Sequence, residues 1–210
     1  MKHRATVIRT LFLVLFLVLI WKGKMMLWLA LFAFSLGLAL LFGRVYCGYV
    51  CPMHTLMIPV EKLGQRLKWQ TNEHPRWLDS GVFPGVALVA SVATMALARR
   101  VLRVNLPILL IWLGASVLIT LRYKQEVFHN LICPFGALQR LFGKGKLFAH
   151  WVDKARCTGC RLCEKVCPSQ AVVVDHDRRA RIDTSLCLQC SACREACRKE
   201  AISYAQASAF

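Results

Sequence analysis

The sequence of 210 residues is short of acidic side chains and of charge in general. It has 11 Asp and Glu against 28 Lys and Arg, a formal net charge of +17, and only 19% charged residues. Soluble domains are about a quarter charged. Hydrophobic residues make up 57% of this chain and come in long blocks. Together these features exclude an ordinary soluble domain.

Several sequence motifs are also missing. The chain has no glycine-rich nucleotide loop, no C-x-x-C-H haem attachment site and no acid–base pair, so we expect no catalytic site for substrate turnover. It has no basic face with interleaved aromatic residues, which argues against nucleic acid as a partner. No small-x-small cleavage site follows the first apolar run, which argues against a signal peptide.

Four apolar runs lie in the first 150 residues: Thr10 to Trp21, Met25 to Phe42, Gly81 to Ala98 and Leu106 to Leu121. Runs of this length and composition predict transmembrane helices. Pro84 and Pro107 are expected in the first turn of their helices, where a missing N–H costs nothing. The sequence therefore predicts a four-helix transmembrane domain over residues 1–150, in contact with membrane lipid.

The basic residues predict the orientation of these spans. With an even number of spans, the N-terminus, the loop of residues 44–80 and everything after Arg122 share one side. Near the ends of the spans, that side carries thirteen basic residues and the other side five. The positive-inside tendency places the richer side in the cytoplasm. We expect a multi-pass protein of the prokaryotic inner membrane, with its C-terminal region on the cytoplasmic side.

The C-terminal residues 151–210 contain an internal repeat. Cys157-x2-Cys160-x2-Cys163-x3-Cys167 recurs, with identical spacing, as Cys187-x2-Cys190-x2-Cys193-x3-Cys197. A shift of 30 residues also aligns Asp153 with Asp183. Each half is expected to form a strand, a cysteine loop, a short helix and a second strand, so this region is predicted to be a small α+β domain.

This spacing is typical of two [4Fe-4S] clusters. Three thiolates on one tight loop reach three corners of a cube, and the fourth cysteine of each run reaches the other cluster. The predicted ligands are Cys157, Cys160, Cys163 and Cys197 for one cluster, and Cys187, Cys190, Cys193 and Cys167 for the other. Structural zinc is an alternative for paired C-x2-C units, and disulfides are disfavoured by a reducing compartment and an odd cysteine count.

Three further cysteines follow apolar runs in motifs of the form ligand-x3-Cys-Pro. These are Cys47-x3-Cys51-Pro and His129-x3-Cys133-Pro. Residues four apart share one face of a helix, so each motif presents a pair of donors. Together Cys47, Cys51, His129 and Cys133 are a candidate third metal or cluster site at the membrane interface. The alternative is that they are small buried residues, with the prolines ending helices.

These motifs resemble known proteins. Residues 151–210 are similar to the bacterial two-[4Fe-4S] ferredoxins, and the whole order of motifs resembles the NapH/NosR-type membrane-bound ferredoxin family. The resemblance implies a membrane-anchored relay of electrons between a quinone pool or a cytoplasmic donor and a respiratory partner protein. It implies an electron-transfer subunit, such as a quinol dehydrogenase component, rather than a stand-alone enzyme. In the family the second motif also begins with cysteine, where this chain has His129.

Two alternative functions remain open from the sequence. One is a redox-linked assembly factor for a metalloenzyme, and the other is a sensor whose cluster state controls a partner. Quinone contact at the inner interface is a further hypothesis. It rests on polar-tipped side chains near the span ends, and an aromatic belt explains them equally. These side chains are His54, His129, Trp69, Trp77 and Tyr123.

Overall fold

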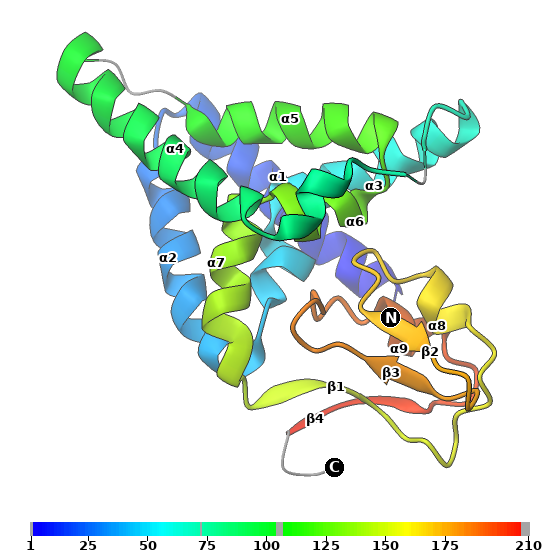
Figure 1. The fold of residues 1–210 in the computed structure, drawn as a ribbon. Helices are drawn as coiled ribbons and strands as arrows, with labels where there is room; N and C mark the ends of the chain where they lie inside the picture. The colour runs from blue at the N-terminus through cyan, green and yellow to red at the C-terminus, as the bar shows by residue number, and fades with distance from the viewer. Residues whose placement is uncertain (1, 72, 104–106, 207–210) are drawn as a thin grey trace. The chain divides into compact units, whose positions relative to one another are not determined.

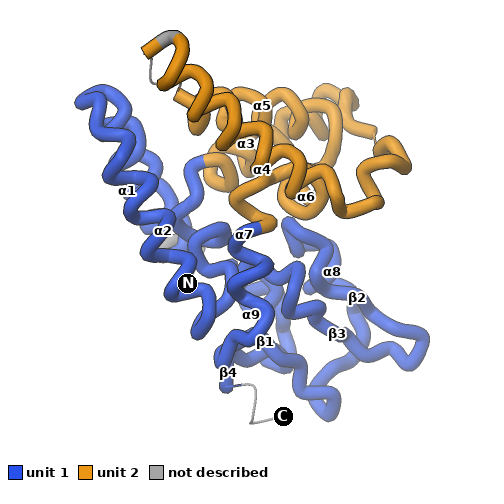
Figure 2. The backbone as a smooth tube through the Cα atoms, turned by 60° about the vertical axis from the view of Figure 1, so that its left-hand side comes forward, with its two compact units in different colours: residues 1–52, 138–210 blue, residues 53–137 orange. Residues whose placement is uncertain are grey.

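The computed structural model describes residues 2–71, 73–103 and 107–206. The chain forms two compact units, one of residues 1–52 with 138–210 and one of residues 53–137 (Figure 2). The division predicted from the sequence, at residue 150, stays a prediction.

The described chain is mostly helical before residue 147 and mixed after it (Figure 1). Its helices and helical turns are α1 (Lys2–Trp21), α2 (Met25–Phe42), η1 (Tyr46–Val50), α3 (Pro52–Arg66), η2 (Arg76–Ser80), α4 (Phe83–Leu97), η3 (Ala98–Leu102), α5 (Ile108–Arg122), α6 (Gln125–Val127), η4 (Phe128–Ile132), α7 (Pro134–Phe142), η5 (Gly143–Gly145), α8 (Leu162–Lys165) and α9 (Ala192–Ala196). Its strands are β1 (Phe148–Val152), β2 (Val172–Val174), β3 (Ala180–Ile182) and β4 (Ile202–Gln206).

In the first unit, α1 and α2 form a hairpin around large aromatic side chains. Gly23 lies between the helices with φ of +66°, a backbone conformation that glycine adopts without strain. The rings of Phe16 and Trp28 meet edge to face at 4.9 Å. The Trp28 Nε1–H donates a hydrogen bond of 3.0 Å to the Tyr46 hydroxyl. This bond fixes η1, and with it Cys47, against the helical hairpin.

In the second unit, a side-chain hydrogen bond joins α4 and α5. The Trp112 Nε1–H of α5 donates to the Ser91 hydroxyl of α4 at 3.0 Å. Pro84 lies in the first turn of α4, as predicted. Pro107 immediately precedes α5 instead of lying inside its first turn. The predicted start of the fourth span, Leu106, lies outside the described residues.

Within the part of the chain that the structure describes, two helical segments are long and apolar enough to cross a membrane, residues 25–42 and 83–101. Two other apolar helical segments, Ala5–Trp21 and Ile108–Arg122, are shorter. A helix of 15 residues, such as α5, extends about 22 Å, whereas a bilayer core is about 30 Å thick. The structure thus supports two candidate spans, and the prediction of four stays a prediction.

The cysteine repeat forms two small antiparallel sheets, β1 with β4 and β2 with β3. Val152 pairs with Ile202 in the first sheet and Val172 with Ile182 in the second. The order of strand, cysteine loop, short helix and strand occurs in both halves, as the sequence predicts. The core of the repeat is a cluster of buried side chains: Cys163, Val172, Val174, Ala180, Cys193 and Ile202.

Candidate functional site

The two halves of the cysteine repeat have matching backbones. The Asp153 and Asp183 carbonyls each accept a hydrogen bond of 3.1 Å from the N–H four residues later, that of Cys157 and Cys187 respectively. The residue before each short helix, Arg161 or Ser191, has φ near +60°. This left-handed residue turns the chain so that the loop cysteines and the short helix surround one space.

The first cavity lies inside the first cysteine loop and has a volume of about 240 Å³. The cysteines that line it are Cys157, Cys160, Cys163 and Cys197. Three of them come from the first half of the repeat and Cys197 from the second. This is the set that the sequence predicts for one cluster, and Cys160 is its exposed member.

The second cavity is smaller and lies inside the other cysteine loop. Its cysteines are Cys187, Cys190, Cys193 and Cys167, again three from one half and one from the other. Both predicted groups of four are therefore brought together by the fold. That they ligate clusters stays a prediction.

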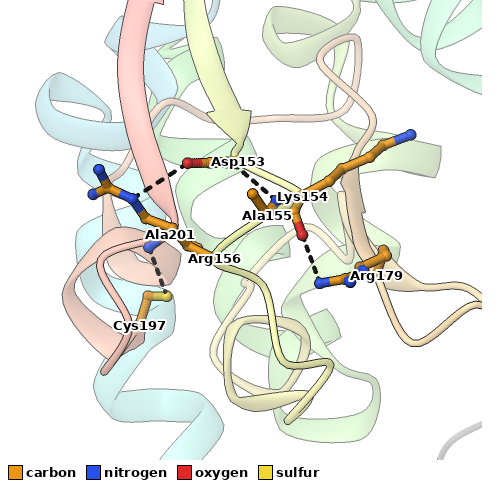
Figure 3. A network of polar contacts seen from close by, with 7 residues as sticks. All are labelled: Asp153, Lys154, Ala155, Arg156, Arg179, Cys197 and Ala201. Carbon is orange, nitrogen blue, oxygen red and sulfur yellow. Dashed lines mark hydrogen bonds and ion pairs between the residues drawn. The ribbon is translucent and has the colours of Figure 1, made fainter.

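Backbone N–H groups point at several of these sulfur atoms. Figure 3 shows the Ala201 N–H directed at the Cys197 Sγ, at 3.4 Å. The Ala171 N–H donates to the Cys167 Sγ at 3.2 Å, and this is the same bond in the other half of the repeat. Such donors favour thiolate over thiol, because they stabilise negative charge on sulfur. The donor set and its N–H bonds fit a thiolate-bound cluster.

Burial has the opposite effect on the thiols. Desolvation raises the pKa of Cys187 to about 12 and also raises the pKa of Cys193. Nearby cysteines add to both shifts because like charges repel. These groups therefore hold their protons until a positive centre displaces them, so that binding such a centre releases protons.

The two Cys-Pro motifs have the same backbone conformation where they end. The Cys51 N–H donates to the Tyr46 carbonyl at 2.9 Å, and the Cys133 N–H to the Phe128 carbonyl at 2.8 Å. Each bond spans five residues and closes a π-helical turn. The next residue is a proline that begins α3 or α7, so these prolines start helices and do not end them.

The candidate third site is divided between the two units. Cys47 and Cys51 are buried in the first unit, and His129 and Cys133 are buried in the second. Among the described residues, no three His, Cys, Asp or Glu side chains gather closely enough to hold a single metal ion. The four-residue site therefore stays a prediction.

A buried pair of histidines lies in the second unit. His54 Nδ1 and His129 Nε2 are 3.0 Å apart, and their rings are 1% and 4% exposed. One ring nitrogen donates its N–H to the other, and the tautomers of the two rings decide which is the donor. From the sequence, both residues are predicted as polar groups near span ends, and His129 also as a candidate ligand of the third site. Their spacing from the Cys-Pro motifs, three residues after Cys51 and four before Cys133, is the signal that could have paired them.

A chain of hydrogen bonds that the sequence did not predict crosses the first unit. The Tyr49 hydroxyl of η1 donates to the Ser191 Oγ at 3.1 Å, and Ser191 Oγ lies 3.2 Å from His150 Nε2. Ser191 is the residue after Cys190, and His150 lines the second cavity. Burial, together with the nearby positive charge of Arg194, lowers the pKa of His150 to about 4.

Comparison with known proteins adds to this geometry. The 4Fe-4S binding domain family matches residues 25–70 and 104–155, and the 4Fe-4S dicluster domain family matches residues 156–202. The first match contains both Cys-Pro motifs and the second contains all eight repeat cysteines. The chain belongs to the NapH/NosR-type ferredoxin family. This is a family of iron–sulfur electron-transfer proteins.

Several known proteins are similar to this chain over most of its length. An uncharacterized protein of Methanocaldococcus jannaschii is 29% identical over 81% of this chain and 68% of its own length. The regulatory protein NosR of Pseudomonas aeruginosa is 26% identical over 75% of this chain and 24% of its own length. The ferredoxin-type protein NapH of Haemophilus influenzae is 29% identical over 64% and 51%. The chain thus spans a quarter to two thirds of these relatives. No solved structure matches it.

Proposed function

We propose that this chain is a membrane-anchored electron-transfer protein that holds two [4Fe-4S] clusters and relays electrons to a redox partner. The observation that carries the proposal is the division of the eight repeat cysteines. Each cavity is lined by three cysteines of one half and one of the other. A zinc site needs four donors around one small ion, and these donors do not need to be divided as three from one half of the repeat and one from the other.

When bound, each cluster would supply one-electron chemistry near its thiolates. The chain's own residues would hold it and set its surroundings. Backbone N–H groups at Ala171 and Ala201 donate to ligand sulfur, which stabilises negative charge there. Buried apolar side chains such as Val174 and Ile202 exclude water from the core between the two cysteine loops.

The exposed faces of the apolar helices support a membrane anchor. Phe34 is 70% exposed, Val89 68% and Leu118 69%, and each lies on a different helix. A helix that presents large apolar groups outward in this way suits lipid better than water. We propose four spans, with the shorter two completed at their ends by side chains that reach the headgroups. The excess of basic residues supports a cytoplasmic position for the cysteine repeat.

Two parts of the proposal concern the helical region. The match of a 4Fe-4S binding domain family over both Cys-Pro motifs supports a third centre at Cys47, Cys51, His129 and Cys133. The buried hydrogen-bonded pair of His54 and His129 supports contact with a quinone. A quinone that is reduced takes up protons at its oxygens, and histidine can supply them. A respiratory or other redox protein would be the partner.

The first test is metal and sulfide analysis of the full chain purified anaerobically in detergent. Two clusters would give about eight iron and eight acid-labile sulfide per chain, and a third cluster about twelve. Dithionite reduction should produce EPR signals of reduced [4Fe-4S] clusters. Colourless protein that contains zinc and remains EPR-silent would overturn the proposal.

A further inference from the structure

The two cavities differ in the charges around them. The charged side chains that line the first cavity are all cationic: Arg161, Arg198 and Lys199. No charged side chain lines the second cavity. Arg178 adds to the first group, because a Cβ on Gly159 would collide with the Arg178 backbone. The first cysteine loop therefore lies under a cationic rim, which is defined here as Arg161, Arg178, Arg198 and Lys199.

The rim is open to solvent. All four of its side chains are exposed, and so is Cys160, the cysteine between Gly159 and Arg161. The Arg161 Nε lies 3.9 Å from the Glu164 Oε2, which is a long distance for an ion pair. A pair this long and this exposed contributes little, so most of the positive charge is available to another molecule.

Neighbouring basic residues are already used inside the molecule. Figure 3 shows Arg156 turned toward the Asp153 carboxylate, which it meets at 3.3 Å, while Arg179 donates to the Lys154 carbonyl at 2.5 Å. Arg179 also donates to the Cys157 carbonyl, and this hydrogen bond holds the first cysteine loop in place. The rim therefore places positive charge that faces outward directly beside the exposed Cys160.

The second cysteine loop is covered by the chain itself. A Cβ on Gly48 of η1 would lie 3.2 Å from the Cys190 Cα and would collide with the Leu188 carbonyl. Arg9 of α1 donates to the Gly48 carbonyl at 2.8 Å and lies 5.7 Å from the centre of the Tyr49 ring. An external protein therefore reaches the first loop and not the second.

We propose that the cationic rim is the docking surface for a soluble electron-transfer protein whose own redox group is surrounded by acidic residues. The inference rests on the proposed function and adds the entry point and the chemistry of the partner. Complementary charge of this kind raises association rates and orients two redox groups toward each other. Cys160, at the exposed edge of the rim, is the ligand closest to such a partner's surface.

The test uses the full chain, loaded with clusters, in nanodiscs of neutral lipid. An acidic plant-type [2Fe-2S] ferredoxin serves as the probe, and its affinity is measured by biolayer interferometry at several salt concentrations. The test variant is Arg161→Glu with Lys199→Glu. The matched control is Lys22→Glu with Lys24→Glu, an exposed basic pair in the turn between α1 and α2 of the same unit.

We expect the rim variant to bind the probe about tenfold more weakly at low salt and with a shallower salt dependence, and the control to bind like the wild type. Stopped-flow reduction by the reduced probe should slow in parallel, whereas reduction by a small neutral reductant should not. Equal loss in both variants, or no loss in either, would overturn the docking surface.

The failure of this inference is distinguishable from failure of the proposed function. If iron content and dithionite-reduced EPR signals are normal but the affinity of the probe is the same for the rim variant and the wild type, only the docking surface is wrong. A preference for anionic over neutral nanodiscs that disappears in the rim variant would assign the rim to lipid headgroups, and this too would overturn the proposal. Absence of iron would instead remove the proposed function itself.

Discussion

The Tyr49 hydroxyl donates a hydrogen bond to the Ser191 Oγ across a sequence separation of 142 residues, at 3.1 Å. Tyr49 lies between Cys47 and Cys51, and Ser191 follows Cys190. The bond therefore joins the first Cys-Pro motif to the second cysteine loop. A second contact supports it, because the backbone of Gly48 packs directly against the same loop.

Gly48 is expected to be essential for this close approach. A Cβ at position 48 would collide with the Leu188 carbonyl and crowd Cys190, and neither backbone group can rotate away. We therefore expect Gly48→Ala to lose the second cluster, so that iron falls to about half while the first cluster remains. Iron analysis and EPR of the reduced protein measure this.

Gly37→Ala is the matched control for Gly48→Ala. Gly37 also lies in a helical segment of the first unit, and a Cβ there meets nothing within 4 Å. This variant should keep full iron and the wild-type EPR spectrum. Full iron in Gly48→Ala as well would show that the contact between η1 and the second loop does not position the ligands.

The exchange of the fourth cysteines can be tested by comparing single variants. Cys197 lines the cavity of Cys157, and Cys167 lines that of Cys187. We expect Cys197→Ser and Cys157→Ser to alter the same EPR signal, and Cys167→Ser to alter the other. If Cys197→Ser instead changes the signal that Cys187→Ser changes, the assignment of ligands to the two clusters is wrong.

Ser35 and Gln139 form a buried hydrogen bond between α2 and α7. The Gln139 Nε2–H donates to the Ser35 Oγ at 2.7 Å, and Gln139 is 0% exposed. Ser35→Ala leaves the amide without this partner and should lower the free energy of unfolding by about 1–2 kcal/mol. Mixed-micelle denaturation monitored by circular dichroism measures the change.

The double variant Ser35→Ala, Gln139→Leu tests the cause of that loss. It removes the amide together with its partner and should recover most of the stability. Ser80→Ala, at an exposed hydroxyl, should change stability by less than about 0.5 kcal/mol. A double variant as unstable as Ser35→Ala would mean that packing, and not the unsatisfied amide, sets the cost.

Glu61 should make the stability of the second unit depend on pH. Burial raises its pKa, although the Gln125 Nε2–H donates to its carboxylate at 2.5 Å. Because the folded state holds this proton more tightly than the unfolded state, stability falls as pH rises from the ordinary range of glutamate through the raised pKa. Glu61→Gln should remove this decrease, which unfolding measured from pH 4 to about 8 would show.

Glu73→Gln controls for the loss of one negative charge, because Glu73 is exposed. It should leave the pH dependence of the second unit as it is in the wild type. A slope that persists in Glu61→Gln would assign the effect to another group.

The sequence predicts the local features of this protein better than the distant ones. The cysteine spacing predicts both groups of four and the strand, loop, helix and strand order, because each depends on residues a few positions apart or on an exact repeat. The π-helical turns before Cys51 and Cys133 were not predicted, since a helical hydrophobic pattern does not distinguish bonds that span four residues from bonds that span five.

Contacts between remote segments, other than those within the cysteine repeat, could not be predicted from residue type alone. His54 and His129 are 75 residues apart, and Tyr49 and Ser191 are 142 apart. Each side chain is polar and common at helix ends, so its type alone indicates no partner. Only the packing of α3 and η4, and of η1 against the second cysteine loop, brings these pairs to hydrogen-bond distance.

The pairing of β1 with β4 also affects how this architecture can be reused. Phe148 lies opposite Gln206 and Val152 opposite Ile202, so the cysteine-bearing segment begins and finishes on neighbouring strands. A segment whose two ends leave from the same edge can be transplanted between hosts without rearranging what surrounds it. The same cysteine-bearing segment can thus be joined to other helical regions, or followed by other domains, while its internal geometry stays intact.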